Sequence, residues 1–351
     1  METGVAAVAA PLVGALPPPE ASSLPYPLRL TQHLGEWEGL TQDTFVLGVL
    51  GEGLKLHVKG TPIAPSIPYM PPQHRAILLP LIEEYIRLGA VEEVARDTLS
   101  LISPVFPVAK QTGGHRLVHN LRNLNRTLTS THFRMETLSD LRILANKGDY
   151  FGKIDISNAY LHVPIRPADT GLLGFTVANR WFKWKALPFG LNLAPRTFTK
   201  VLRPVMAELR RQGIRCLIYI DDLIIIASSQ EQAAADIATA VKLLSRLGLS
   251  INKDKSQLTP SQQVTYLGFQ IDSTTAQIAV PHSMQHKILK ALRVFQTSPT
   301  TTIRHAACIL GKLRALQPAI ASHSSVPARY STSSTTMSKR VGSPLTPSPH
   351  R

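Results

Sequence analysis

The chain reads LIYIDDLIIIA from Leu217 to Ala227, with two adjacent acids, Asp221 and Asp222, between two apolar runs. The flanking residues are mostly β-branched or large aliphatic, a composition typical of buried strands. We therefore predict a tight hairpin that holds both carboxylates at its tip. Two like charges held together are costly unless a cation neutralises them, and a divalent metal with oxygen ligands, most often Mg²⁺, is the simplest solution. The alternative interpretation is an exposed turn whose acids face water.

A third acid, Asp155, lies upstream in a comparable setting. Phe151–Ile156 is predicted to be a short strand that carries it, followed by a turn and Tyr160. Taken alone, Asp155 could be a cap or turn residue, since Asp is common there. The surrounding segments, however, follow one another in a recognisable order. These segments are Pro107–Lys110, Gly113–Val118, Leu121–Asn125, Trp184–Leu191, Ala194–Lys200, Gly248–Asn252 and Tyr266–Phe269.

This ordered set, together with the Tyr219–Asp222 tetrapeptide, resembles the reverse transcriptases of retroelements. The resemblance covers residues 81–268 well and continues more thinly to about Pro318. The segments His132–Leu138 and Ala159–Ile165 look closest to the DIRS-type tyrosine-recombinase retrotransposons. LTR-type elements and hepadna-like polymerases share much of the same pattern.

The resemblance implies an α+β, right-hand polymerase fold with fingers, a palm of antiparallel sheet plus helices, and a partial thumb. It also implies nucleotidyl transfer with two Mg²⁺ ions, for which Mn²⁺ is a substitute. Asp155 and Asp221 would be the main ligands, joined by the backbone carbonyl of Ile156, and Asp222 would complete the acidic cluster. Carboxylates suit this chemistry because Mg²⁺ prefers hard anionic oxygen.

Further roles are implied for residues that match the same pattern. Lys110 and Arg116, on either side of a Gly-Gly hairpin tip, would contact the incoming triphosphate; the alternative is a pair of ordinary surface cations. Tyr160 would screen the sugar against a 2′-hydroxyl, although a buried Tyr is more often a core aromatic. The remaining assignments are Phe189 and Gly190 beneath the nascent base pair, Lys255 near the leaving pyrophosphate, and Tyr266, Leu267, Gly268 and Phe269 as the primer grip.

Composition supports a globular, nucleic-acid-binding protein. The chain has 351 residues, 44% of them hydrophobic, and a formal net charge of +15. Such a charge suits a phosphate backbone. The resemblance implies an RNA template with a DNA or RNA primer, and dNTPs, as partners. With only Cys216 and Cys308, no disulfide framework is expected, which favours a reducing, intracellular setting in the cytoplasm or nucleus. No apolar stretch reaches transmembrane length, so no membrane partner is expected, and the oligomeric state stays open.

The chain divides into five predicted segments. They are a disordered leader (1–30), an extension containing Trp37 (31–71), the fingers and palm (72–270), a thumb-like connection (271–320) and a disordered Ser/Thr/Pro-rich tail (321–351). Apolar periodicity predicts helices over Ala76–Leu88, with a possible start at Pro80 instead, over Thr197–Gln212 and over Glu231–Leu247. Helical segments are also expected within Met284–Leu316.

The function favoured by the sequence is that of an RNA-directed DNA polymerase of a retrotransposon. One alternative is a catalytically silent, nucleic-acid-binding remnant, because no ribonuclease H segment follows and the tail looks foreign, whether from a truncated or misjoined frame or as a genuine disordered tail. Another is a polymerase of the same fold that prefers DNA templates.

Overall fold

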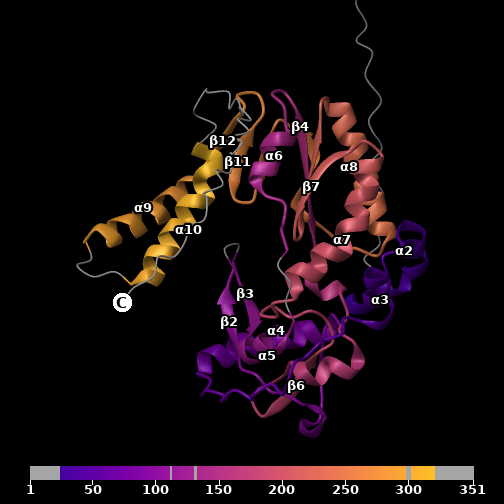
Figure 1. Ribbon diagram of the computed structural model, residues 1–351, viewed down its shortest axis with the longest axis vertical. Coiled ribbons are helices and arrows are strands. Elements are labelled where there is room, and N and C mark those ends of the chain that lie inside the picture. The colour runs from indigo at the N-terminus through magenta and orange to yellow at the C-terminus, as the bar shows by residue number, and fades with distance from the viewer. Residues whose placement is uncertain (1–23, 111–112, 130–132, 298–301, 321–351) are drawn as a thin grey trace, which may run out of the picture.

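The computed structural model describes residues 24–110, 113–129, 133–297 and 302–320 (Figure 1). Its largest sheet, here called the central sheet, has the strand order β7-β8-β4-β9 with every pair antiparallel. The strands are β7 (Arg215–Tyr219), β8 (Asp222–Ala227), β4 (Tyr150–Ile156) and β9 (Ile251–Ser261). The two apolar runs of the opening segment thus form β7 and β8, so the predicted hairpin is confirmed.

Both faces of the central sheet are covered. Because side chains alternate along a strand, Leu223 and Ile225 of β8 pack into one core, with Ile237, while Ile224 and Ile226 pack into another. The helices α7 (Ala194–Arg211) and α8 (Gln230–Arg246) pack on the first side. The second core is closed by α6 (Leu138–Leu144) and a small sheet of β10 (Gln263–Tyr266), β11 (Phe269–Asp272) and β12 (Gln277–Ala279). The two helices predicted over Thr197–Gln212 and Glu231–Leu247 are therefore present with slightly shifted ends.

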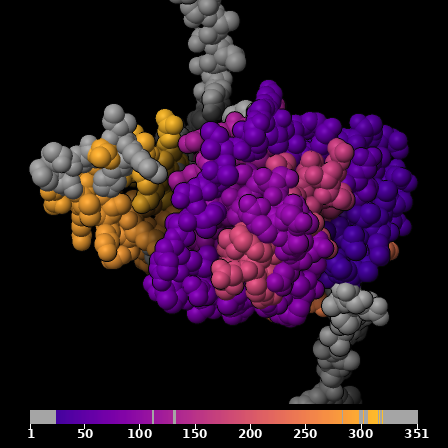
Figure 2. All heavy atoms as spheres, turned by 90° about the horizontal axis from the view of Figure 1, so that it is seen from below, coloured from indigo at the N-terminus to yellow at the C-terminus, as the bar shows by residue number. Residues whose placement is uncertain are grey.

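A second group of elements lies below the central sheet in the view of Figure 1. It contains a three-stranded sheet of order β1-β6-β5 and the two-stranded β2-β3 hairpin. The strands are β1 (Val91–Glu93), β2 (Val105–Ala109), β3 (His115–His119), β5 (Gly174–Val177) and β6 (Arg180–Trp184). The helices are α4 (Pro72–Arg87) and α5 (Arg122–Thr127), with short 3₁₀ turns η1 (Arg96–Thr98), η2 (Ala159–His162) and η3 (Pro167–Leu173). Figure 2 shows that these parts of the chain form one continuous face, with the C-terminal part to one side.

Helix α4 is longer than predicted. It begins at Pro72, four residues before the expected Ala76, so a start at Pro80 is wrong and Pro80 lies inside the helix. The sequence suggests why: Pro71 and Pro72 suit the first helical turn, where a missing N–H costs nothing. The end at Gly89 is as predicted, since Gly89 follows the cap Leu88 with φ of +72°.

Three N-terminal helices pack onto the rest of the chain. They are α1 (Tyr26–Gln32), α2 (Leu34–Leu40) and α3 (Thr44–Glu52), here called the N-terminal helices. The indole N–H of the fully buried Trp37 donates to the carbonyl of Leu247 at 3.0 Å. The prediction of disorder over residues 1–30 is wrong for Tyr26–Leu30, because α1 buries Tyr26 and Leu30 in the main core. The leader is rich in proline and alanine, and this composition predicted disorder although Tyr26 and Leu30 are buried.

Two helices end the described chain. They are α9 (His282–Thr297) and α10 (Ile303–Ile320), which cover most of the region predicted to hold helical segments. Helix α10 packs against β12 and α6 (Figure 1). Residues 1–23 and 321–351, which hold the rest of the predicted leader and the predicted tail, lie outside the described residues. Among the helices described, none is both long and apolar enough to cross a bilayer.

Candidate active site

The tip of the β7–β8 hairpin is a two-residue turn. Tyr219 is paired with Asp222, which leaves Ile220 and Asp221 as the turn residues. Ile220 has φ of +57°, in the left-handed region that β-branched residues rarely adopt. The turn therefore has a constrained backbone at the point where it presents Asp221.

Asp155 meets this turn from the neighbouring strand. It is the last but one residue of β4 and is the register partner of Asp222 on β8. The backbone N–H of Ile156 donates to the carbonyl of Asp221 at 2.9 Å, which ties the end of β4 to the turn. Antiparallel pairing thus brings Asp155 next to the adjacent pair Asp221 and Asp222, which lie more than 60 residues later in the sequence, and places Ile156 beside them.

The three carboxyl groups repel one another. Burial, and then the charge of Asp221, raise the pKa of Asp155 to about 6, and Asp155 is only 9% exposed. The pKa of Asp221 is raised by burial and then by Asp222, and that of Asp222 is raised by burial. Each shift opposes the charged form, so the site favours a neutralising cation.

Two lysines partly offset this repulsion. The ammonium of Lys153 on β4 lies 3.8 Å from a carboxylate oxygen of Asp222. Lys255 on β9 lies close enough to lower the pKa of all three acids. Lys255 was predicted here, but Lys153 was missed. The available signal was its position two residues before Asp155 on one strand, which puts both side chains on the same face.

The donor set suits a hard divalent cation such as Mg²⁺, since it consists of carboxylate oxygens with raised pKa values. In the described part of the chain, however, no group of three or more His, Cys, Asp or Glu side chains is arranged to hold a metal ion. The carboxylates of Asp155, Asp221 and Asp222 would therefore have to move for all three to share an ion.

An aromatic wall stands next to the acids. Tyr160, in η2, contacts Phe189 and Phe198 with ring centres 5.3 and 6.1 Å apart. Burial, and then Asp221, raise the pKa of Tyr160 to about 12. The guanidinium of Arg116 lies 4.2 Å from the centre of the Phe189 ring. Arg116 also lowers the pKa of Asp221, so β3 brings a cation toward the acids.

Gly190 is fixed by close backbone approach. Its φ is +114°, and a Cβ at this position would overlap the carbonyl oxygen of His119. His119 N–H donates to the Phe189 carbonyl at 2.8 Å, and the Asn125 side-chain amide donates to the Gly190 carbonyl at 2.8 Å. Only glycine fits this crossing of two chain segments. Sequence reasoning named Gly190 but missed His119 and Asn125 as its supports.

Two of the predicted elements remain to be placed: Lys110 and the segment Tyr266–Phe269. Lys110 is exposed at the end of β2, and its backbone N–H donates to Gly114 at 3.0 Å within the hairpin. The segment Tyr266–Phe269 forms the β10–β11 turn, with positive φ at Leu267 and Gly268. The Tyr266 hydroxyl lies 3.4 Å from the Asp222 carbonyl, so this turn abuts the acidic end of the sheet.

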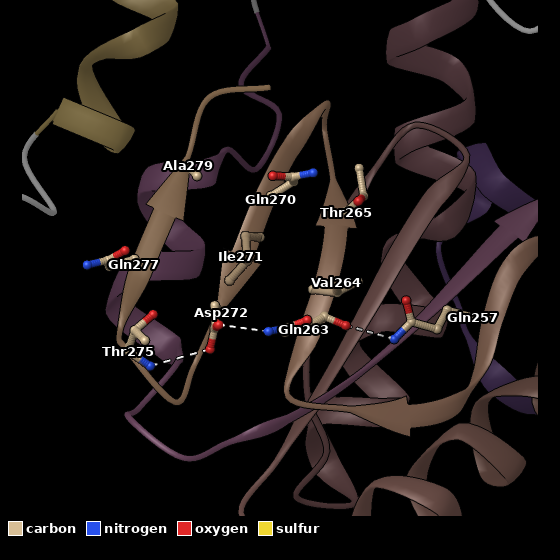
Figure 3. Close-up of a pocket in the computed structure, with 10 residues that line it drawn as sticks. All are labelled: Gln257, Gln263, Val264, Thr265, Gln270, Ile271, Asp272, Thr275, Gln277 and Ala279. Atoms are coloured by element: carbon tan, nitrogen blue, oxygen red, sulfur yellow. Dashed lines mark hydrogen bonds between the residues drawn. The ribbon is translucent and has the colours of Figure 1, made fainter. Parts of the chain in front are cut away.

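A separate hollow of about 430 Å³ lies on the outer face of the β10–β11–β12 sheet (Figure 3). Its lining includes Gln257, Gln263, Gln270 and Gln277, and the amide of Gln263 donates to Asp272 at 2.9 Å. The lining residues do not include Asp155, Asp221 or Asp222, so this hollow is separate from the acidic site.

Comparison with known proteins identifies the domain. Residues 108–271 match the family model described as "Reverse transcriptase (RNA-dependent DNA polymerase)". Residues 108–271 form a reverse transcriptase domain. That stretch includes the acids, the aromatic wall and the β10–β11 turn. The predicted resemblance to reverse transcriptases is therefore confirmed over these residues.

Relatives of this reverse transcriptase domain occur in retroviruses and caulimoviruses. The Gag-Pol polyprotein of avian leukosis virus subgroup A is 30% identical over 257 residues, which are 70% of this chain and 15% of the polyprotein. The enzymatic polyprotein of figwort mosaic virus is 25% identical over 228 residues, or 64% of this chain and 32% of the polyprotein. The chain thus spans about a seventh to a third of the length of these relatives.

Solved structures of foamy viral protease-reverse transcriptase share the fold. One in complex with double-stranded DNA has a TM-score of 0.59 and 20% identity, covering 82% of this chain and 52% of that chain. Another, in complex with an RNA/DNA hybrid, has a TM-score of 0.57 and 22% identity, covering 74% and 34%. The prediction of an α+β, right-hand polymerase fold is confirmed at the level of the fold.

Proposed function

We propose that this chain is an RNA-directed DNA polymerase that extends a primer on an RNA template. The observation that carries the proposal is the meeting of Asp155, Asp221 and Asp222 at one end of the central sheet, next to Tyr160 and Arg116. Such a cluster, with raised pKa values in a polymerase fold, is where nucleotidyl transfer is expected.

Within this proposal, Asp155, Asp221 and the carbonyl of Ile156 hold two Mg²⁺ ions, and Asp222 contributes more weakly because Lys153 already pairs with it. When bound, such ions lower the pKa of the primer 3′-hydroxyl and stabilise the leaving pyrophosphate. Mn²⁺ offers the same charge and serves as a substitute. The chain supplies the anionic oxygens and the β4–β8 register that keeps them adjacent.

The remaining residues position the substrates. Arg116 can grip phosphate oxygens through two N–H groups while its guanidinium rests on Phe189, and Lys110 and Lys255 add point charges. Tyr160 would clash with a 2′-hydroxyl and so favour deoxynucleotides. Residues Tyr266, Leu267, Gly268 and Phe269 would hold the primer end, since this turn abuts Asp222.

The proposal also includes the layout and the partners. Residues 72–270 form fingers and palm, 271–320 a thumb-like connection, and 31–71 an extension. The foamy viral structures are complexes with double-stranded DNA or an RNA/DNA hybrid, which supports a primed template as the partner, with dNTPs as substrate. The segments His132–Leu138 and Ala159–Ile165 support an origin in a DIRS-type retrotransposon. Free thiols at Cys216 and Cys308 suit a reducing, intracellular setting.

Primer extension on a primed RNA template in Mg²⁺ tests the function. We expect extension by the wild type and a loss on the order of a hundredfold or more in Asp221→Asn. Asp254→Asn, an exposed acid on β9, is the matched control and should retain full activity. A folded wild type that binds the primed template without extending it would instead support the silent remnant. Faster extension on a DNA template would support the DNA-templated alternative.

A further inference from the structure

We propose that helix α1 is a positioning element of the active site, acting through Arg29 and Tyr26 on the chain corner at Ser250. The inference rests on the proposed polymerase function, because it concerns how Asp155 and Tyr160 are held. It assigns a role to the N-terminal helices, which the family domain at residues 108–271 does not include.

The backbone of Ser250 is hydrogen-bonded both to η2, which carries Tyr160, and to the segment that follows Asp155. Its N–H donates to Nε2 of His162 at 3.2 Å, and its carbonyl accepts from the N–H of Ser157 at 2.8 Å. His162 lies two residues after Tyr160 in η2, and Ser157 lies two residues after Asp155. A displacement of Ser250 therefore reaches both the residue proposed to screen the sugar and the strand of a proposed metal ligand.

Helix α1 holds this corner from outside. An Arg29 guanidinium nitrogen donates to the Ser250 hydroxyl at 2.5 Å, and the guanidinium stacks 3.9 Å from the centre of the Tyr26 ring. The ring of Tyr26 in turn forms a T-shaped contact with the fully buried His162 ring, with centres 4.8 Å apart and planes at 77°. Arg29 and Tyr26 thus grip Ser250 and its partner His162 from one helix.

Close packing leaves α1 little freedom to move. Gly248, with φ of +84°, lies so close that a Cβ would be 2.7 Å from the Arg29 carbonyl oxygen. At the other end of α1, the Tyr26 N–H donates to the Leu88 carbonyl at 2.9 Å, where α4 ends. Helix α1 is therefore wedged between the end of α4 and the start of β9. Because tightly packed interfaces transmit displacement, a change in α1 is expected to reach the site.

Two variants loosen this grip without touching the proposed ligands. Arg29→Met keeps much of the stacking volume but removes two hydrogen bonds, the one to Ser250 and the one from Nε to the Leu24 carbonyl at 2.9 Å. Ser250→Ala removes only the acceptor of the first, so it isolates the contact with the corner. Glu36→Gln is the matched control, because Glu36 lies on the neighbouring helix α2 in an exposed pair with Arg246 at 3.1 Å. Single-nucleotide incorporation of dNTPs and rNTPs would be compared well below the unfolding temperature, with kcat and KM resolved.

We expect the preference for dNTPs to fall about three- to tenfold in Ser250→Ala, the range for losing one charge-assisted hydrogen bond at a positioning contact. The fall should be at least as large in Arg29→Met, which also loses the bond to the Leu24 carbonyl. Glu36→Gln should match the wild type. In a Tyr160→Ala background, Arg29→Met should change the preference no further. A lowered Tm with unchanged preference and kcat would overturn the inference, as would an equal effect with and without Tyr160.

Amide hydrogen exchange provides a readout that needs no activity. Arg29→Met should speed exchange over residues 157–163 and 249–252 but leave α8 unchanged. Unchanged exchange in those segments would overturn the inference. The wild type could fail to extend a primer while Arg29→Met still exchanges faster than the wild type in those segments. That result would contradict the proposed function but leave the coupling of α1 to the site in place.

Discussion

Asp155 on β4 and Asp222 on β8 are direct cross-strand partners at the end of the central sheet where Asp221 forms the turn. Like charges opposite each other across an antiparallel pair destabilise a sheet. Burial is the main reason that the pKa is raised in all three acids, and repulsion between the carboxylates raises the pKa of Asp155 and Asp221 further. The charged carboxylates at this site are therefore unfavourable for folding unless a cation neutralises them.

Stability should depend on pH through Asp155. Its pKa rises from 3.8 to about 6 on folding, so between these values the folded state binds more protons than the unfolded state. This contribution to stability therefore falls as pH rises from about 4 to 6 and stays low above that. Buried His119 and His162, with pKa values lowered to about 3, act in the opposite direction below pH 6.5.

The difference in stability between wild type and Asp155→Asn, followed against pH, isolates the contribution of Asp155. Melting curves in EDTA from pH 4 to 8 should show Asp155→Asn gaining stability relative to wild type through this window. Added Mg²⁺ should raise the Tm of the wild type more at pH 7.5 than at pH 5, because only ionised acids bind it. If Tm depended on pH in the same way in both proteins, the raised pKa assigned to Asp155 would be wrong.

Lys153→Met should tighten the binding of Mg²⁺. Lys153 lies 3.8 Å from an Asp222 oxygen, so it competes with any added cation for that carboxylate. Removing it should also destabilise the metal-free protein by leaving the three acids less neutralised. Calorimetric titration with Mg²⁺ would measure the first effect and a melt in EDTA the second. Weaker Mg²⁺ binding in Lys153→Met would show that Lys153 supports the site rather than competing for it.

Gly190→Ala should both destabilise the fold and impair nucleotide use. The new Cβ would overlap the His119 carbonyl, and φ of +114° is unfavourable for any L residue with a side chain. We expect a loss of about 2 kcal/mol or more in the free energy of unfolding. Urea denaturation would measure it. Gly213→Ala, at φ of +83° with open space around it, is the control for the backbone cost alone and should lose less.

Arg116→Lys should raise the KM for dNTPs about tenfold while changing kcat less. Lysine keeps the charge but loses the planar group that stacks at 4.2 Å on Phe189 and can bind phosphate through two N–H groups. Lys110→Met should have a smaller effect, since Lys110 is exposed at the end of β2. Steady-state kinetics on one template compares the two. A larger effect at Lys110 would reverse their proposed ranking.

Local sequence patterns predicted much of the fold around the site. The apolar runs beside Asp221 and Asp222 predicted the hairpin, because β-branched residues on both sides of two acids suit strands joined by a short turn. Periodicity predicted α7 and α8 to within a few residues at each end. These elements depend on contacts close in sequence, which a pattern can reveal.

Contacts between distant segments could not be predicted in the same way. The fit of Gly190 against His119 depends on how two loops cross, and nothing local marks it. The spacing of Lys153 and Asp155 puts them on one face of a strand, but the pairing of Lys153 with Asp222 depends on the register of β4 against β8. Tyr26 and Arg29 lie within the leader whose composition predicted disorder, and their partners His162 and Ser250 lie far along the chain.

Ile220 has a consequence for attempts to make this protein more heat-resistant. Its left-handed backbone, with φ of +57°, costs a β-branched residue about 1–2 kcal/mol that glycine would not lose. A search for stabilising substitutions would therefore favour glycine at this turn. The same replacement would give the backbone beside Asp221 more freedom. Glycine at this position is therefore expected to raise the melting temperature but to hold the Asp221 carboxylate less firmly.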